Sequence, residues 1–276
     1  MPTATDAELV ELLTTGHLTP VGRIVDSSNG ALLCSVDAGA ASGGPSPASG
    51  GPVLVIHKPE AHERPLWDYP DGTLVARERA AYLVSAAGGF DVVPPTVLRD
   101  GPLGPGSVQL WVGPVEGPRE ALVDVTPAGE VHEGWVVVLE GRTPAGEPVV
   151  VSHSREPALR TVAVLDAVLN NSDRKGGHLL RDGAVVRGCD HGVSLGVEPK
   201  LRTVLWGWAG DRLPAADVGR LETLLDALAA DLAAELADLL TRAEVRALRA
   251  RTEALLRTRR HPHPQPGWPA IPWPAL

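Results

Sequence analysis

Four charged residues, widely separated in the sequence, could together carry out phosphoryl transfer. Lys58 ends an apolar run of strand length, and Glu78 lies on the helix expected next. Asp173 follows a later helix, and Asp190 follows a short hairpin. This chemistry needs a lysine that neutralises phosphate oxygens, a glutamate that holds the lysine, carboxylates for Mg²⁺ and an aspartate near the acceptor hydroxyl. The sequence offers a candidate for each requirement, in this order.

Two short motifs surround the aspartates. Residues Asn171–Leu180 read NSDRKGGHLL, which resembles the N-x-D-R-x-x-x-x-N catalytic loop of phosphatidylinositol 3- and 4-kinases and of HipA-type kinases. The sequence Cys189–Gly192 resembles the metal-binding D-x-G motif of the same kinases. The residues between the two aspartates suffice for one hairpin, Leu179 to Val186, with Asp-Gly at its turn. The order, spacing and flanking strands together predict a kinase-like site.

The resemblance extends along most of the chain, over roughly residues 5 to 260. Here the chain is similar to an actinobacterial family of phosphoinositide-kinase-like proteins, linked by co-occurrence to organisms that make mycothiol. The resemblance implies a bilobal kinase-like fold with ATP between the lobes, and leaves the acceptor undefined. The segments that carry it are VIHKP, GTLVARERAAYLV, VPPTVLRDGPLGPGSVQLWV, LNNSDRKGGHLL and KLRTVLWGWAG.

The resemblance also implies a role for each charged residue. Lys58 would contact the α- and β-phosphates of ATP, and Glu78 would pair with this lysine. Asp173 would orient the acceptor, and Asp190 would chelate Mg²⁺. The catalytic set is completed by the two residues that follow Asp173 in its motif, Arg174 and Lys175.

Two further segments are expected to bind the nucleotide. Ser27 and Ser28, in the first predicted hairpin, could donate hydrogen bonds to phosphate, or could simply form a polar turn. The segment Leu110, Trp111 and Val112 is expected to link the lobes, where backbone groups would meet adenine. Trp111 could equally be an ordinary core residue.

One position departs from the kinase pattern. The related loops have a metal-binding asparagine five residues after the aspartate, where this chain has His178. A neutral imidazole can bind a divalent cation, but nitrogen shifts the preference from Mg²⁺ toward Mn²⁺ or Zn²⁺. Asn170 or Asn171 could supply the missing oxygen, although both precede the aspartate. The sequence therefore predicts a metal pair of Asp190 and His178, with Mg²⁺ or Mn²⁺ as the ion.

Residues 1–113 are expected to form an α+β lobe with a small antiparallel sheet. The turn Ser27–Gly30 ends in Asn-Gly, a strong hairpin signal, and residues 38–52 are almost entirely Gly, Ala, Ser and Pro, which predicts a flexible loop. Asp71 or Thr73 could cap the helix after the third strand. The expected helices are 6–14 and 74–88, and the expected strands are 21–25, 31–36, 53–56, 92–98 and 108–112, with a turn-rich stretch at 99–106.

Residues 114–260 are expected to form a mainly helical lobe, which begins with an irregular β excursion. The tail 261–276 has Pro at every second or third position between its Trp and His residues, so it should be extended. This tail could pack on the surface, which we favour, or recruit a protein partner. The expected elements are strands 135–139 and 149–151, a helix over 156–169, the hairpin 179–186 and two or three helices between 215 and 257.

Composition excludes several classes of protein. The 276 residues carry a net charge of −9, which disfavours nucleic acid and acidic membranes as partners. No stretch approaches the ~18 apolar residues of a spanning helix, and the N-terminus resembles neither a signal nor a transit peptide. We therefore expect a cytoplasmic protein whose partners are ATP and an acceptor.

Three functions are consistent with these observations. The first is an ATP-dependent phosphotransferase that acts on a hydroxyl of a small molecule or a protein. The second is a nucleotide-binding pseudokinase, in which His178 marks the loss of catalysis. The third is an enzyme on the same fold that transfers AMP instead of phosphate. Lipid kinase activity is a weaker fourth possibility because the chain is acidic and lacks an apolar membrane-docking segment.

Overall fold

The computed structural model describes residues 5–24, 30–37, 52–70, 73–117 and 119–276, and within them it is an α+β structure with an antiparallel sheet and six α-helices. Ser27, Ser28 and nearly all of the predicted loop 38–52 lie outside the described residues. The nucleotide contacts predicted for the two serines, and the flexibility predicted for the loop, therefore stay predictions.

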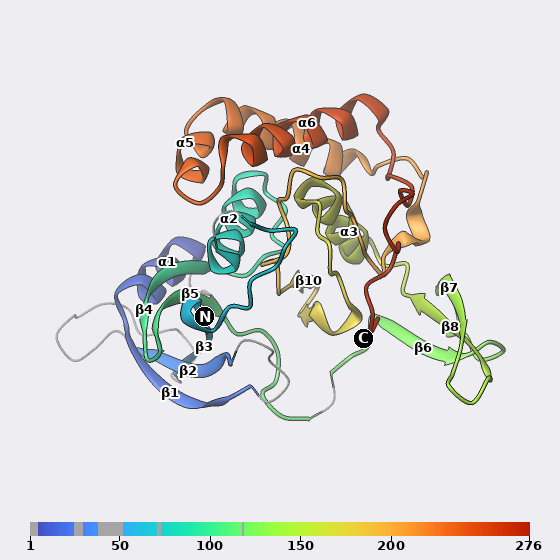
Figure 1. The fold of residues 1–276 in the computed structure, drawn as a ribbon, viewed down its shortest axis with the longest axis horizontal. Helices are drawn as coiled ribbons and strands as arrows, with labels where there is room; N and C mark the ends of the chain where they lie inside the picture. The colour runs from blue at the N-terminus through green and yellow to red at the C-terminus, as the bar shows by residue number, and fades with distance from the viewer. Residues whose placement is uncertain (1–4, 25–29, 38–51, 71–72, 118) are drawn as a thin grey trace.

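A five-stranded antiparallel sheet forms the N-terminal part of the chain, in the order β1-β2-β3-β5-β4 (Figure 1). Its register places Val55 opposite Leu110 and Lys58 opposite Ser107. Leu13 of the helix α1 (Asp6–Thr15) packs on the sheet in a small apolar core with side chains of β2–β5. The strands are β1 (His17–Arg23), β2 (Leu32–Asp37), β3 (Val53–Pro59), β4 (Thr96–Gly101) and β5 (Gly104–Leu110).

The stretch 99–106, expected to be mostly turn, instead lies largely within strands β4 and β5. Only a tight connection at Pro102 and Leu103 separates the two strands. A Cβ added at Gly106 would collide with the carbonyl oxygen of Lys58, so glycine here lets β5 approach β3 closely. Gly106, one of the glycines that suggested a loop, therefore allows β5 to pack closely against β3.

Helix α2 (Leu74–Ala87) carries Glu78 and begins and ends as predicted. The Thr73 hydroxyl accepts a hydrogen bond from the Ala76 N–H at 3.2 Å, which makes Thr73 the N-cap. The buried side chains of Ala80, Ala81, Tyr82 and Val84 on α2 belong to the large core, which also contains side chains of α3–α6, and α2 lies against β4 and β5 as well. A buried ion pair of 2.6 Å between Arg77 and Glu244 also ties α2 to α6.

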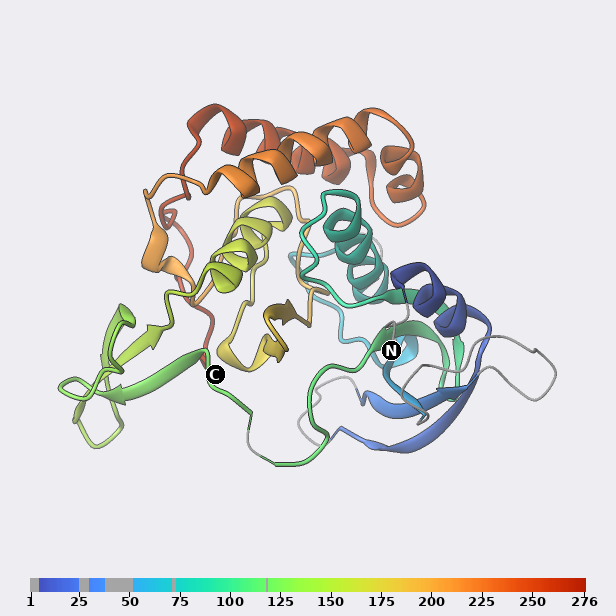
Figure 2. The same cartoon turned by 180° about the vertical axis from the view of Figure 1, so that it is seen from behind.

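The C-terminal part is mainly helical, with α4 and α6 side by side above α2 and α3 (Figures 1 and 2). The predicted β excursion is a three-stranded sheet in the order β6-β8-β7, and the hairpin before Asp190 forms as expected. The elements are β6 (Val123–Pro127), β7 (Val136–Arg142), β8 (Pro148–His153), α3 (Pro157–Leu169), β9 (Leu179–Asp182), β10 (Val185–Gly188), α4 (Ala215–Ala229), α5 (Leu232–Ala237) and α6 (Arg242–Thr258).

The tail after α6 is extended and packs along the C-terminal part of the chain. The Gly176 N–H donates to the Ala275 carbonyl at 2.8 Å, and the Thr203 N–H donates to the Ala270 carbonyl at 3.0 Å. The ring of Trp268 stacks on the ring of Trp67. The tail thus reaches the loop that follows Asp173, which agrees with the packing alternative favoured for it.

None of the described helices is both long enough and apolar enough to cross a lipid bilayer.

Buried histidines make the stability of this fold depend on pH between about 4 and 6.5. Burial lowers the pKa of His153 and of His261 to about 4 from the ordinary 6.5. Their Nε2 atoms accept hydrogen bonds from the Gly207 N–H at 3.1 Å and from Arg160 Nε at 3.1 Å, which only neutral rings can do. Such histidines stabilise the fold fully above pH 6.5, and this stabilisation is lost as the pH falls through 4.

We therefore expect a lower Tm at pH 5 than at pH 7.5, with each of the two histidines accounting for about 1–2 kcal/mol of lost stability. Thermal unfolding followed by circular dichroism at the two pH values measures this. Substituting His261 with Gln should reduce the pH dependence. Identical Tm values for the unsubstituted protein at both pH values would contradict the prediction.

Candidate active site

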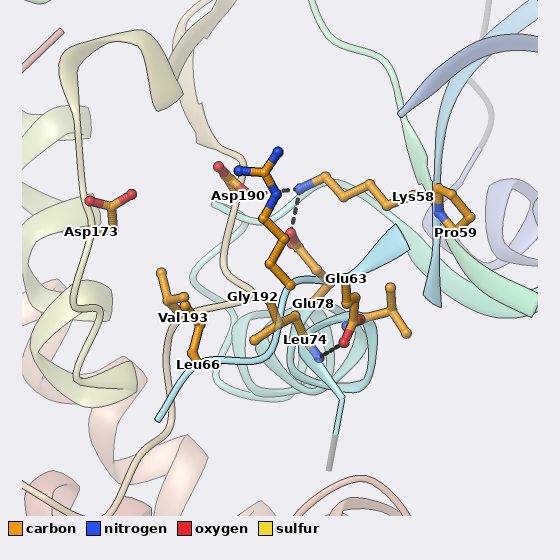
Figure 3. A pocket seen from close by; sticks show the side chains of 12 residues that line it. Lys58, Pro59, Glu63, Leu66, Leu74, Glu78, Asp173, Asp190, Gly192 and Val193 are labelled. Atoms are coloured by element: carbon orange, nitrogen blue, oxygen red, sulfur yellow. Dashed lines mark hydrogen bonds and ion pairs between the residues drawn. The ribbon is translucent and has the colours of Figure 1, made fainter. Parts of the chain in front are cut away.

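Lys58, at the end of β3, lies between two carboxylates that come from distant parts of the chain. Its Nζ forms an ion pair with Glu78 of α2 and another, of 2.9 Å, with Asp190 (Figure 3). The second oxygen of Glu78 accepts a hydrogen bond from the His191 N–H at 3.0 Å. Glu78 therefore holds both the lysine and the backbone that follows Asp190.

The charges of this cluster stabilise one another. Burial opposes the charge on Lys58, but Asp190 and Glu78 together outweigh it and raise the pKa of Lys58 above its ordinary value. The ammonium of Lys58 lowers the pKa of Asp190 well below its usual range. Lys58 is therefore cationic and Asp190 anionic at neutral pH. The predicted pairing of Lys58 with Glu78 is present in the structure.

The predicted metal pair is also brought together. Asp190 follows β10 in a left-handed conformation, with φ of 60°. His178 Nε2 lies 3.3 Å from an Asp190 carboxylate oxygen. Burial lowers the pKa of His178 to about 4, so its imidazole is neutral at pH 7.

The donor set fits a divalent cation only if the nucleotide contributes ligands. Within the described part of the chain, no group of three or more His, Cys, Asp or Glu side chains is arranged to hold a metal. Mg²⁺ in phosphoryl-transfer sites is held by one or two carboxylates, while phosphate oxygens and water supply the other ligands. The carboxylate of Asp190 matches this arrangement. The imidazole nitrogen of His178 departs from it, because the usual protein ligands of Mg²⁺ are oxygen atoms.

Asp173 follows α3 in the loop predicted to orient the acceptor. Its N–H donates to the side-chain oxygen of Asn171 at 3.0 Å, which fixes the backbone of the loop. Lys175 Nζ lies 3.3 Å from the Asp173 carboxylate. Burial nevertheless raises the pKa of Asp173 above its ordinary value. The site therefore holds a carboxylate more basic than usual next to a lysine.

Arg174 lies behind the site and is fully buried. Its guanidinium makes a two-pronged contact with Asp166 of α3, with its shortest distances at 2.9 Å. It also donates to the Cys189 carbonyl at 2.9 Å and lies 2.7 Å from His191 Nε2. Arg174 thus joins the loop of Asp173 to the segment of Asp190. We assign it a positioning role in place of the catalytic one expected from the motif.

The two asparagines considered as substitute metal ligands are engaged elsewhere. The Asn170 side-chain oxygen accepts from the Lys200 N–H at 2.8 Å. The Asn171 amide donates to Asp166 at 3.0 Å, while its oxygen accepts from the Asp173 N–H. Both side chains therefore shape the loop, and His178 remains beside Asp190.

The segment expected to meet adenine follows β5. The Trp111 N–H donates to the Leu54 carbonyl at 2.9 Å, and its indole nitrogen donates to the Gly113 carbonyl at 3.0 Å. Trp111 is half-buried and Val112 is buried. Neither of them, nor Leu110, lines the pocket around Lys58. Their predicted contact with adenine stays a prediction.

An open pocket of about 190 Å³ brings the charged residues together. Figure 3 shows Asp173 on one wall, across from the cluster of Lys58, Glu78 and Asp190. Sequence reasoning missed the segment that follows β3, which forms another wall. The lining residues are Lys58, Pro59, Glu63, Arg64, Leu66, Leu74, Val75, Glu78, Asp173, Asp190, Gly192 and Val193.

Tyr69 is a second residue that the sequence did not indicate. Its hydroxyl lies 2.8 Å from the Ser172 hydroxyl and donates to the Val193 carbonyl at 2.9 Å. It therefore ties the residue before Asp173 to the segment after Asp190. No local motif marks this tyrosine, because its partners are distant in the sequence.

If Asp173 acts on an acceptor of ATP-dependent transfer, as the sequence predicts, replacing Tyr69 with Phe should lower the rate of ATP turnover about tenfold and leave the KM for ATP unchanged, because a hydroxyl that holds the residue before Asp173 is lost. Loss of the buried hydrogen bond should cost about 0.5–1.5 kcal/mol of stability. Tyr82→Phe, a change at a buried tyrosine on α2, is the matched control. Equal kcat values for the two variants would contradict the positioning role.

Comparison with known proteins identifies one close relative. No family model matches the chain. Among solved structures, a crystal structure of the Golgi casein kinase is similar over 92% of this chain and 74% of its own length, with a TM-score of 0.48 and 12% sequence identity. Protein Rv2133c of Mycobacterium tuberculosis is 44% identical over 276 residues, which cover 96% of this chain and 94% of the relative. The chain therefore belongs to the family of protein Rv2133c.

Proposed function

We propose that this protein is an ATP-dependent phosphotransferase that uses a divalent cation and acts on a hydroxyl group. The observation that carries the proposal is the position of Lys58, held by Glu78 and Asp190 in a pocket that also contains Asp173. Phosphoryl transfer is catalysed mainly by positioning and charge, and these are the charges it requires. The motif resemblance to phosphoinositide kinases supports the same reading.

Each residue would have a distinct task. Lys58 would bind the α- and β-phosphates, and Glu78 would keep its ammonium in place. Asp190, with His178, would hold the divalent cation, which neutralises charge on the phosphates when bound. Asp173 would orient the acceptor hydroxyl and receive its proton as the oxygen attacks phosphorus. Lys175, next to Asp173, would offset charge on the transferred group.

His178 sets the expected metal preference. A neutral imidazole beside Asp190 favours Mn²⁺ over Mg²⁺ compared with an amide oxygen. We expect His178→Asn to raise the ratio of Mg²⁺-supported to Mn²⁺-supported ATP turnover, by about tenfold. Metal titrations of the rate of ADP formation in both proteins measure this ratio. His132→Asn, in the connection between β6 and β7, serves as a control. An unchanged ratio in His178→Asn would remove His178 from the metal site.

The proposal is tested by calorimetric titration of the purified protein with ATP in the presence of Mg²⁺, of Mn²⁺ and of no metal. Mass analysis of the same samples then identifies the products. Metal-dependent binding with ADP formation is expected. AMP attached to protein would instead favour AMP transfer, and binding without any turnover would favour a pseudokinase. Failure to bind ATP under all three conditions would overturn the proposal.

A further inference from the structure

The pocket begins at Lys58, Glu78 and Asp190 and extends to the segment that follows β3, at the end of β3 opposite to the predicted adenine contact. Val55 pairs with Leu110, and Lys58 is three residues further along the strand. At ~3.3 Å per residue, about 10 Å separates these two levels of β3. The lining residues Pro59 and Arg64 follow Lys58 in the chain. A nucleotide with its base near Leu110 and its phosphates at Lys58 would therefore enter the pocket at its Lys58 wall and leave the part around Arg64 free.

Most charged groups of the pocket already have partners. Lys58 pairs with Glu78 and Asp190. Both oxygens of Glu63 accept N–H groups from the first turn of α2, at 2.9 and 2.7 Å. That carboxylate therefore occupies the helix N-terminus and leaves no room there for another anion.

Arg64 is the exception among the charged groups of this pocket. Its side chain is exposed, and across the described ranges it has no ion pair and no hydrogen bond. A guanidinium offers several donors in a planar fork that matches a carboxylate or a phosphate. The guanidinium of Arg64 is therefore available to donate hydrogen bonds to an anionic ligand, and it lines the same pocket as Asp173.

The other lining side chains limit the size and nature of a ligand. Leu66, Leu74, Val75 and Val193 give the pocket an apolar side. A volume of about 190 Å³ lies below the ~300–1,000 Å³ of pockets for drug-sized ligands. The part of this volume that nucleotide phosphates at Lys58 would leave free therefore suits a small molecule with a short carbon skeleton, a hydroxyl near Asp173 and an anionic group near Arg64.

We propose that the part of this pocket around Arg64 is the acceptor site, that the acceptor is a small hydroxyl compound bearing a carboxylate or phosphate group, and that Arg64 selects it. This inference rests on the proposed phosphotransferase function. The alternative source of the anion is the terminal phosphate of the nucleotide itself. The two sources differ in whether anion and nucleotide bind together or compete.

The test uses inorganic phosphate and acetate as probes of the anion site, titrated by calorimetry into protein saturated with Mg²⁺ and the non-hydrolysable ATP analogue AMP-PNP. We expect at least one anion to bind together with AMP-PNP. Arg64→Gln should weaken this binding about tenfold, and Arg64→Lys should weaken it less. Arg155→Gln, at another exposed arginine without a partner in the described residues, should have no effect, and AMP-PNP affinity should be the same in every variant.

Anion binding that is unchanged in Arg64→Gln would overturn the inference. Competition between the anion and AMP-PNP, together with weaker AMP-PNP binding in Arg64→Gln, would also overturn it and assign Arg64 to the nucleotide. If AMP-PNP does not bind at all, the proposed function fails. In that case the same titration without nucleotide still shows whether Arg64 forms an anion site.

Discussion

Replacing Asp190 with Asn is expected to abolish metal-dependent ATP binding and to lower turnover by roughly 10²–10³-fold. The amide has nearly the same shape but lacks the charge that would hold a divalent cation and that attracts Lys58 at 2.9 Å. Lys58 keeps its partner Glu78, so the fold should survive. Calorimetry with ATP and Mn²⁺ or Mg²⁺ measures binding, and thermal unfolding checks the fold.

Two further variants serve as controls for Asp190→Asn. Asp182→Asn, at the end of β9 in the hairpin before Asp190, removes an exposed carboxylate that pairs with Arg187 and should change neither binding nor turnover. Asp173→Ala should retain ATP binding and lose transfer, because in the proposed function its carboxylate would face the acceptor. Unchanged metal-dependent binding in Asp190→Asn would refute the metal assignment. Equal loss of ATP binding in Asp173→Ala would refute the acceptor role.

Replacing Asp166 with Ala is expected to destabilise the protein by about 3–5 kcal/mol, because it leaves the fully buried Arg174 without its charged partner. Arg174 also contacts the segment of Asp190 through the Cys189 carbonyl, so the loss should spread to the site. Chemical denaturation followed by fluorescence measures the free energy of unfolding.

An exposed ion pair serves as the control that distinguishes the effect of losing a carboxylate from the effect of leaving a buried charge without a partner. Glu253 pairs with Arg249 at 3.0 Å on the surface of α6, with both side chains about half exposed. Glu253→Ala should cost less than about 0.5 kcal/mol. If Asp166→Ala does not fold, Asp166→Asn keeps the hydrogen-bonding shape and should give a measurable intermediate loss. Similar small losses for Asp166→Asn and Glu253→Ala would contradict the structural role of the buried pair.

The features that depend on local sequence were predicted well. The cap at Thr73, the helix that carries Glu78 and the hairpin before Asp190 follow from residue spacing and turn chemistry, which act over a few residues. The resemblance to kinases implied the pairing of Lys58 with Glu78, and one strand and one helix bring the two side chains together in the structure. These are also the elements on which the candidate site is built.

The features that depend on distant partners were not predictable. The hydroxyl of Tyr69 meets Ser172 and Val193 only after the chain has folded. The dipeptide Asp173-Arg174 suggested two reacting groups. In the structure the Arg174 side chain is fully buried and forms an ion pair with Asp166. The stretch 99–106 was misread because glycine and proline mark both loops and places where strands approach closely. In each case the deciding contact comes from another part of the fold.

Helix α2 belongs to both parts of the molecule. Its buried Ala80, Ala81, Tyr82 and Val84 pack in the large core with the C-terminal helices, while Arg79 of the same helix donates to the Thr96 carbonyl of β4. Glu78, also on α2, pairs with Lys58 of β3 and accepts from the His191 N–H. A displacement of the sheet relative to the C-terminal helices would therefore act on α2, and through Glu78 it would reach Lys58 and the segment of Asp190 at the same time.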